Sequence, residues 1–321
     1  MKFVLLGTSD FTLQCASALI ECGMELAALI SMPAHLLPDN SADIAGFAVE
    51  HGVTYHEVED INDLPSIELL KSYSPDYLFS TWPRIIKKPV LEIPAFFCIG
   101  THPTKLPHNR GRHPLHWLLA MGIRESALSF FRMDEGIDSG NILLQIPYAL
   151  SENDTIGDVV ARVNMFANEG TCRLCKMLRE SPDSAGIEQD QGRANYWRKR
   201  TLHDVTIDFR MSCSAIVRTV NSFAPPYPAA KLIFRRHVLE IIDASEVSID
   251  YLQPGFESLE PGRVLESERD RDSLVVKTDD GFVRLVVKGE VPVELLAAGV
   301  IEPPGCYWQK YSDILSQRIM L

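Results

Sequence analysis

The chain has 321 residues and a mass of 36.0 kDa, a length that suggests about two domains. Its 31 Lys and Arg against 43 Asp and Glu give a formal net charge of −12 at pH 7. This acidity argues against general binding to nucleic acid or to anionic membranes, although a local basic patch stays open. The charged fraction is 23% and the mean hydropathy is −0.01, as in ordinary soluble globular proteins.

No segment approaches the run of about 18 apolar residues that a membrane span needs. The apolar run at 2–6 is too short for a signal peptide. The seven Cys are scattered and odd in number, so we expect a reducing compartment, the cytoplasm, and no disulfide framework. Cys172 and Cys175 form a CxxC within a helical pattern. Zinc needs two further ligands that no nearby pair offers, so we expect structural thiols and no metal.

The first half of the chain alternates apolar runs with helical stretches, which indicates a strand–helix–strand repeat. Helices are expected at 11–23 and 41–52, each with Gly at its end. A longer helix at 155–179 closes this region, with capping residues before it. The runs expected to form strands are 2–6, 25–31, 77–81, 95–100 and 126–133.

These strands predict a doubly wound, mostly parallel α/β sheet, because apolar strands without polar alternation are buried on both faces. In such sheets, ligands bind outside the carboxyl ends of the strands. We therefore expect the chemistry in the loops 7–10, 80–84, 99–107 and 133–140.

The second half has a different pattern. A polar, turn-rich stretch at 180–200 indicates a linker or long connection. A helix around 214–221 and several short strand-like runs follow, and Asp279-Asp280-Gly281 between two apolar runs is a hairpin signal. Short strands with turns between them favour a small β-barrel. We predict an α/β catalytic domain over 1–195 and a β domain over 196–321.

The densest group of chemically active residues is the loop at 100–114, GTHPTKLPHNRGRHP, which follows a predicted strand. About thirty residues later comes MDEGIDSG at 133–140, whose turn formers suit a loop that returns a carboxylate toward the His residues. A His beside an Asp can shuttle a proton, because the carboxylate orients the ring and stabilises its charged form. An ordinary surface loop is the alternative that composition leaves open.

The order GTSDF, HPTKLPxxRGRxPxxW and MDEGIDSGNIL resembles the formyltransferase family that uses N10-formyltetrahydrofolate. Its members formylate methionyl-tRNA, glycinamide ribonucleotide or nucleotide sugars. The match is strongest over 1–145. A weaker match at IDF…SAIVRTVNSFAPPYPAA resembles the start of the family's small OB-like domain. The resemblance implies a Rossmann-like α/β fold followed by an OB-like C-terminal β domain.

The resemblance also implies direct transfer, in which a primary amine attacks the formyl carbon and tetrahydrofolate leaves. His102 and Asp138 match the family's catalytic residues. His102 would stabilise the oxyanion and manage the amine proton, while Asp138 would tune His102 and hold a proton-relaying water. The pterin would lie between two loops and be contacted largely through backbone groups; Trp82 could equally be a packing residue. The cofactor-binding residues implied are Trp82, Arg84, Ile85, Ile86, Met133, Asp134, Gly136 and Asp138.

Gly100 departs from the family, which has Asn two residues before the His. Gly has no amide to donate to an oxyanion, and loss of one such donor costs on the order of 10²–10³ in rate. Three explanations stay open. A backbone N–H, a water or Lys105 could replace the missing amide, or the enzyme could be slow or use a more reactive amine. The protein could also have kept the fold without the transfer activity. Gly also permits close approach of backbone or a bulky ligand. Since His102 and Asp138 keep their motif contexts, we favour a working enzyme.

The amine is expected to be small and phosphorylated. Methionyl-tRNA formyltransferases carry a basic insertion after the second strand, whereas 31–40 contains no Lys or Arg here. The basic run 197–200 is expected to be a solvated connection. Cations of the 100–114 loop could clamp phosphates, and the start of the first helix could hold anionic groups. The expected substrate-binding residues are Thr8, Ser9, Lys105, Asn109 and Arg110, with Arg112 as a further candidate.

We therefore expect a nucleotide-linked amino sugar as substrate, of the kind used in surface-polysaccharide or secondary-metabolite synthesis, and neither nucleic acid nor membrane as partner. Methionyl-tRNA formylation, hydrolysis of formyltetrahydrofolate with water replacing the amine, and a catalytically weakened folate-binding homologue stay open as alternatives. The sequence leaves the oligomeric state open, and a homodimer is compatible with it.

Overall fold

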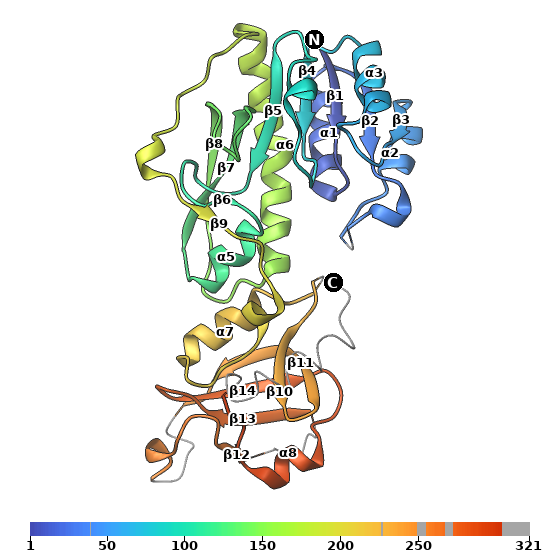
Figure 1. Cartoon of the computed structure of the whole chain (residues 1–321). Coiled ribbons are helices and arrows are strands. Elements are labelled where there is room, and N and C mark those ends of the chain that lie inside the picture. The colour runs from blue at the N-terminus through green and yellow to red at the C-terminus, as the bar shows by residue number, and fades with distance from the viewer. Residues whose placement is uncertain (39, 226, 249–254, 267–271, 304–321) are drawn as a thin grey trace. The chain divides into compact units, whose positions relative to one another are not determined.

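The computed structural model describes residues 1–321 except 39, 226, 249–254, 267–271 and 304–321. The chain divides into two compact units (Figure 1). The first unit comprises Met1–Pro114, Glu125–Leu150 and Val159–Arg198, and the second comprises Leu115–Arg124, Ser151–Asp158 and Lys199–Leu321. The predicted boundary between 195 and 196 stays a prediction.

The first unit is built on a seven-stranded sheet of order β3-β2-β1-β4-β5-β7-β8. Strands β1 to β5 pair in parallel, while β7 is antiparallel to both β5 and β8. The doubly wound, mostly parallel sheet expected from the sequence is confirmed. The strands are β1 Lys2–Leu6, β2 Glu25–Ser31, β3 Thr54–Glu57, β4 Tyr77–Ser80, β5 Phe97–His102, β7 Glu125–Arg132 and β8 Ile142–Ala149.

Local signals set the ends of several helices. Helix α2 begins after Asp43, whose side chain accepts the Gly46 N–H, and ends at Gly52, where φ is 65°. Glycine adopts this left-handed backbone without steric cost, which is why it stops the helix as predicted. The helices of this half of the chain are α1 Asp10–Glu21, α2 Ile44–His51, α3 Leu64–Ser72, α4 Lys88–Leu91, α5 Pro114–Ala120 and α6 Ile156–Glu180.

The second unit contains a five-stranded antiparallel sheet of order β10-β11-β14-β13-β12. Its apolar core includes Ile216 of helix α7 and Leu285 of β14, both fully buried. The predicted Asp-Asp-Gly hairpin is confirmed, since Lys277 pairs with Phe282 across the turn. The elements are α7 Cys213–Asn221, β10 Ala230–Phe234, β11 His237–Glu246, β12 Val264–Glu266, β13 Ser273–Lys277, β14 Phe282–Val287 and α8 Val293–Ala298.

Two details bear on the site. Strand β5 extends to His102, two residues beyond the predicted end, because Thr101 and His102 pair with Phe130 and Ser129 of β7. The stretch 180–200 is also more than a linker, since it contains β9 (Tyr196–Trp197), which pairs with β6 (Arg110–Gly111). Among the described residues, no helix is long and apolar enough to cross a membrane.

Candidate active site

His102 and Asp138 lie together in the first unit. His102 is the last residue of β5, and Asp138 lies in the loop between β7 and β8. The His102 Nδ1 atom is 3.5 Å from Asp138 Oδ2, and the two side chains are 6% and 19% exposed. A carboxylate this close can orient the imidazole and accept its proton, so the pair has the geometry of an acid–base couple.

The His102 ring is fixed from its other side as well. Its Nε2 atom lies 2.8 Å from the carbonyl oxygen of Asn109. Thr104 Oγ1 donates to the same carbonyl at 3.2 Å. Both ring nitrogens thus face oxygen acceptors, and the ring is held between a carbonyl and a carboxylate.

Asp138 is held in an unusual backbone conformation, with φ of 52°. Its Oδ2 atom accepts the backbone N–H of Gly111 at 2.9 Å. Gly111 itself has φ of 104°, and a Cβ there would lie 2.3 Å from the Trp197 carbonyl oxygen. Only glycine therefore brings this N–H to Asp138 while β6 stays paired with β9.

The position of Gly100 is filled by neighbouring side chains. A Cβ on Gly100 would lie 2.7 Å from Phe131 Cζ and 2.9 Å from Met133 Cγ. On the side where a Cβ would lie, Gly100 therefore leaves no free space for a ligand or a backbone segment. The volume of the family's Asn side chain is taken up by an aromatic ring and a thioether.

The two loops expected to hold a pterin lie in the same unit, and the second is bonded to helix α4, which follows the first. Lys88 of α4 donates to Glu135 at 2.9 Å, and this hydrogen bond raises the pKa of the Lys88 ammonium. Asp134 shapes its own loop, because its Oδ1 accepts the Gly136 N–H at 3.0 Å and the Ser139 hydroxyl at 2.7 Å.

Trp82 and Ile86 are 8% and 6% exposed and pack in the core of the first unit. The Trp82 Nε1 atom is buried without a hydrogen-bond acceptor among the described residues. An orphaned buried donor is costly unless a ligand or water satisfies it, and the Trp82 Nε1 atom shares this state with five other buried side-chain atoms among the described residues. Ile85 is 69% exposed, and the exposed Arg84 donates to the Glu59 carbonyl.

The expected substrate residues differ in their exposure. Lys105 is exposed, and Asn109 is half-buried with φ of 64°. Thr8 is 4% exposed, and Ser9 is the N-cap of α1. The exposed Arg112 donates to the Pro83 carbonyl at 3.3 Å.

Arg110 requires a correction. Its side chain is fully buried, and its guanidinium donates to Gln189, Gln191 and Tyr196. A phosphate would have to displace these partners, so Arg110 is not available as a substrate contact in this structure.

Sequence reasoning missed the residues that return to the site from the polar connection, Gln189 and Asn195 above all. Gln189 donates to the carbonyl oxygens of Asp138 and Gly140, and Asn195 bonds to Asn109. One signal was available: Tyr196-Trp197 places two aromatic residues in an otherwise polar stretch, which indicates a segment that packs against the domain.

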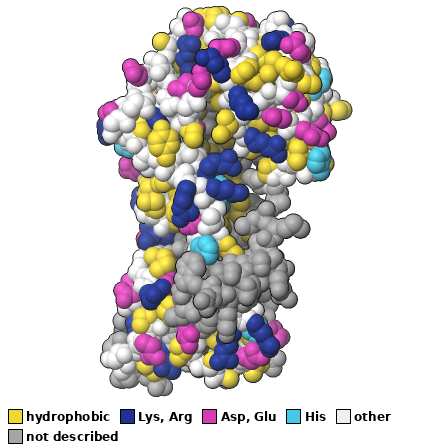
Figure 2. Space-filling view, viewed as in Figure 1, with side chains coloured by type: hydrophobic (Ala, Val, Ile, Leu, Met, Phe, Trp, Pro, Cys, Tyr) yellow, Lys and Arg dark blue, Asp and Glu magenta, His cyan; other side chains and the backbone are white. Residues whose placement is uncertain are grey.

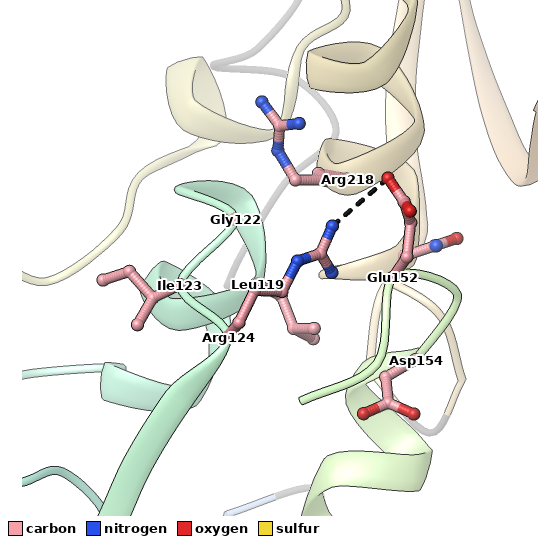
Figure 3. Close-up of a pocket in the computed structure, with 8 residues that line it drawn as sticks. Leu119, Gly122, Ile123, Arg124, Glu152, Asp154 and Arg218 are labelled. Carbon is pink, nitrogen blue, oxygen red and sulfur yellow. Dashed lines mark ion pairs between the residues drawn. The ribbon is translucent and has the colours of Figure 1, made fainter. Parts of the chain in front are cut away.

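The pocket drawn in Figure 3 is a separate feature of the second unit. An ion pair of 3.2 Å joins Arg124 and Glu152 beside it. None of the predicted site residues lines this pocket, and no role in the chemistry of His102 follows from it.

The sequence matches the formyl transferase family over residues 1–174 and the C-terminal domain of formyl transferases over residues 200–289. A methionyl-tRNA formyltransferase of Lachnospira eligens is 27% identical over 268 residues, covering 79% of this chain and 84% of that protein. One of Pelotomaculum thermopropionicum is 27% identical over 288 residues, covering 88% and 89%.

The fold is similar to that of solved formyltransferases. The sugar 3N-formyltransferase WlaRD aligns with a TM-score of 0.66 and 16% identity, covering 91% of this chain and 99% of that one. A methionyl-tRNA formyltransferase from Clostridium thermocellum aligns with a TM-score of 0.53 and 19% identity, covering 77% and 93%. With matches to both domains of the family, the chain belongs to the formyl transferase family and is an enzyme that transfers a formyl group.

Proposed function

We propose that this enzyme moves a formyl group from N10-formyltetrahydrofolate to the primary amine of a small phosphorylated substrate, a nucleotide-linked amino sugar. The observation that carries the reaction type is the buried pair of His102 and Asp138, 3.5 Å apart, in a chain of the formyl transferase family. The choice of amine rests on separate observations of charge and of the loop after β2.

The loops around residues 82–86 and 133–138 fit a folate. The unsatisfied Trp82 Nε1 offers a buried donor, and the exposed Ile85 and Ile137 offer apolar surface. When bound, the folate supplies the activated formyl group. The WlaRD structure was determined in the presence of dTDP and 5-N-formyl-THF, which supports the same donor class here.

The two side chains have distinct tasks in this proposal. An amine that attacks a formyl carbon must lose a proton, and the formyl oxygen gains negative charge as it does so. His102 manages that proton and stabilises that oxygen, for which its Nε2 atom must release the Asn109 carbonyl that it contacts in this structure. Asp138, fixed by the Gly111 N–H, keeps the ring oriented. With no side chain at residue 100 to donate, the oxygen depends on His102 and on backbone or water donors.

A small anionic amine fits the surface better than a tRNA does. The loop after β2, residues 31–40, contains no Lys or Arg, and the net charge is −12. Nucleic-acid affinity comes largely from contacts between cations and phosphates, and the excess of acidic over basic residues opposes the approach of a long polyanion. Lys105 and Arg112 are exposed, and Figure 2 shows Lys and Arg side chains along the middle of the first unit's visible face. A few local cations suffice for a nucleotide diphosphate.

The test is an assay of N10-formyltetrahydrofolate with a panel of amines. dTDP-3-aminofucose belongs in the panel, because a Helicobacter canadensis N-formyltransferase of similar fold was solved with it. Tetrahydrofolate release should depend on a nucleotide-linked amino sugar, and the product should gain one formyl group. Release without any amine would identify a hydrolase. Folate binding without release under any condition would identify a weakened homologue, and either result overturns the proposal.

Methionyl-tRNA formylation is the second candidate. The relatives from Lachnospira eligens and Pelotomaculum thermopropionicum carry that name and match over most of their length. The same assay with initiator Met-tRNA, and a gel shift at moderate salt, decide between the two. We expect no shift and no formyl-Met-tRNA. A gel shift together with formyl-Met-tRNA would identify tRNA, and not an amino sugar, as the substrate.

A further inference from the structure

The polar connection between helix α6 and the second unit returns to both loops that hold the catalytic pair. Strand β9 runs parallel to β6, with Arg110 opposite Tyr196 and Gly111 opposite Trp197 (Figure 1). The residues just before β9 therefore lie beside the 103–113 loop. Their side chains make specific bonds there, which a passive linker would not need.

The first of these bonds joins Gln189 to Arg110. Gln189 is 2% exposed and Arg110 is fully buried. The Arg110 Nη2 and Nε atoms donate to Gln189 Oε1 at 2.7 and 3.2 Å. Because a guanidinium has only donors, the amide must turn its oxygen toward Arg110. The orientation of the Gln189 amide is thereby set.

Because the Gln189 side-chain oxygen accepts from Arg110, the NH2 group of the same amide faces the opposite way. It donates to the carbonyl oxygen of Asp138 at 2.8 Å and to that of Gly140 at 2.7 Å. These two carbonyls bracket the end of the 133–140 loop. A reversed amide would place its oxygen against both carbonyl oxygens and its NH2 against a cation, so one orientation satisfies every group.

Asp138 has left-handed backbone, φ of 52°, which Asp adopts more readily than most non-glycine residues but which is still a minority conformation that these bonds favour. The same connection holds the other side of the ring. Asn195 Oδ1 accepts the Asn109 N–H at 2.9 Å, and Asn109 also has left-handed backbone. The Asn109 carbonyl is the one that contacts His102.

We propose that Gln189 is a positioning residue for formyl transfer. Its amide, oriented by the buried Arg110 guanidinium, holds Asp138 in the conformation that aims the carboxylate at His102. The proposal rests on the roles of His102 and Asp138 given under the proposed function, and it adds a part of the chain that lies 51 residues beyond Asp138.

The decisive variant is Gln189→Glu. Glutamate keeps an oxygen for Arg110, but it turns an oxygen instead of an NH2 toward the Asp138 and Gly140 carbonyls. Displacement of a catalytic group by about 1 Å can cost on the order of 10²-fold in rate. We expect kcat to fall about 10- to 100-fold, with the KM for N10-formyltetrahydrofolate changed less than about twofold.

Gln191→Glu is the matched control. Gln191 also accepts from Arg110, at 2.9 Å, but its own amide donates to the Gln189 carbonyl and not to the Asp138 loop. The variant adds the same charge beside the same guanidinium. Its kcat should stay within about twofold of wild type. Equal losses in the two variants would assign the effect to charge and overturn the proposal.

A double-mutant cycle separates positioning from a general structural role. If Gln189 acts through Asp138, Gln189→Glu should cost less than about twofold in an Asp138→Asn background. Losses that multiply in the double variant would overturn the inference, since they would show that Gln189 acts independently of Asp138.

Crystal structures of the two glutamate variants distinguish failure of the inference from failure of the proposed function. If wild type formylates no amine, the proposed function falls, but the geometry remains testable. Asp138 should leave the left-handed region and lose its Gly111 N–H bond in Gln189→Glu and keep both in Gln191→Glu. An unmoved Asp138 in a folded Gln189→Glu variant overturns the inference.

Discussion

The backbone of the loops around His102 differs from that of the five-stranded sheet in the second unit. Among the described residues, five non-glycine residues have left-handed backbone, and three of them, Asn109, His113 and Asp138, lie in the two site loops. In the second unit, Arg235 in the turn between β10 and β11 also has left-handed backbone, but the turn between β13 and β14 uses an Asp-Asp-Gly signal between strands that pack into an apolar core.

The difference shows where each region gets its shape. The second sheet is specified by local signals and by burial of apolar side chains, which act together. The site loops place left-handed backbone at Asn, His and Asp, the non-glycine types that tolerate it best, and distant partners such as Gln189 and Asn195 bond to these loops. The conformation of the site loops therefore depends on contacts with distant parts of the chain as well as on local signals.

The largest effect should come from the catalytic pair. His102→Ala and Asp138→Ala should each lower kcat by about 10²–10⁴, the contribution typical of a positioned acid–base group. Val49→Ala, at an 83% exposed position of α2, is the control and should retain full turnover. Steady-state assays at matched folded concentration check this. Activity within tenfold of wild type in both site variants would contradict the assignment.

A core substitution in the second sheet should act on stability alone. Leu285 is fully buried, and Leu285→Ala should lower the free energy of unfolding by about 2–5 kcal/mol through lost burial and a cavity. Turnover per folded molecule at 25 °C should stay unchanged. Urea unfolding and assays measure the two quantities. Val293→Ala, at a 79% exposed position, should shift stability by less than about 0.5 kcal/mol.

Gly100→Asn places the family's Asn at residue 100 and tests whether the space beside that residue is filled. Gly100→Asn would press its Cβ against Phe131 and Met133, and overpacking of this kind typically costs about 1–3 kcal/mol. We therefore expect a lower melting temperature and no gain in kcat. Phe131→Leu in the same chain should recover part of the stability.

Gly52→Asn is the control for this substitution. Its φ is 65° with nothing within 4 Å of the added Cβ, and Asn tolerates this backbone better than most residues. It should lose little stability. A Gly100→Asn variant that turns over faster at an unchanged melting temperature would show that the site has room for the amide.

The smallest effect should be a pH-dependent one in the hairpin. The Asp280 carboxylate accepts the Cys213 N–H at 2.7 Å, which lowers the pKa of Asp280 below its ordinary value of 3.8. The ionised form is thus stabilised by folding. Its contribution is complete above pH 3.8 and is lost as the pH falls through the lower pKa of the folded state.

Asp280→Asn should therefore be less stable than wild type at about pH 7, by at most about 1 kcal/mol because the side chain is exposed. The difference should shrink toward about pH 3. Urea unfolding at the two pH values measures it. Asp279→Asn, one residue earlier, is the control. A stability difference between wild type and Asp280→Asn that widens on acidification would contradict the lowered pKa of Asp280.

Much of the fold was accessible to sequence reasoning because its signals are local. Gly52 ends α2, Asp-Asp-Gly forms a hairpin, and apolar runs without alternation form the central strands. Two strands of the seven-stranded sheet were missed, as was the short pair of β6 and β9. β3 is the polar TYHE, and β8 contains Pro147 directly after Ile146, which weakens its strand pattern.

The site was only partly predictable for the opposite reason. The motifs around His102 and Asp138 indicated the pair, and the structure places these residues together. The buried state of Arg110, by contrast, depends on Gln189, 79 residues away, and the filled space at Gly100 depends on Phe131 of β7. Side-chain contacts across such separations leave no periodic or spacing signal in one sequence.

The pairing of β6 with β9 has a consequence for domain exchange between relatives. A chimaera joined between residues 181 and 188 would take Gln189, Asn195 and β9 from the other parent, although α6 and all strands of the seven-stranded sheet precede that junction. A junction after Trp197 would keep β9 with its native partner Gly111. Recombination in this family should therefore tolerate crossovers after β9 and penalise those before it.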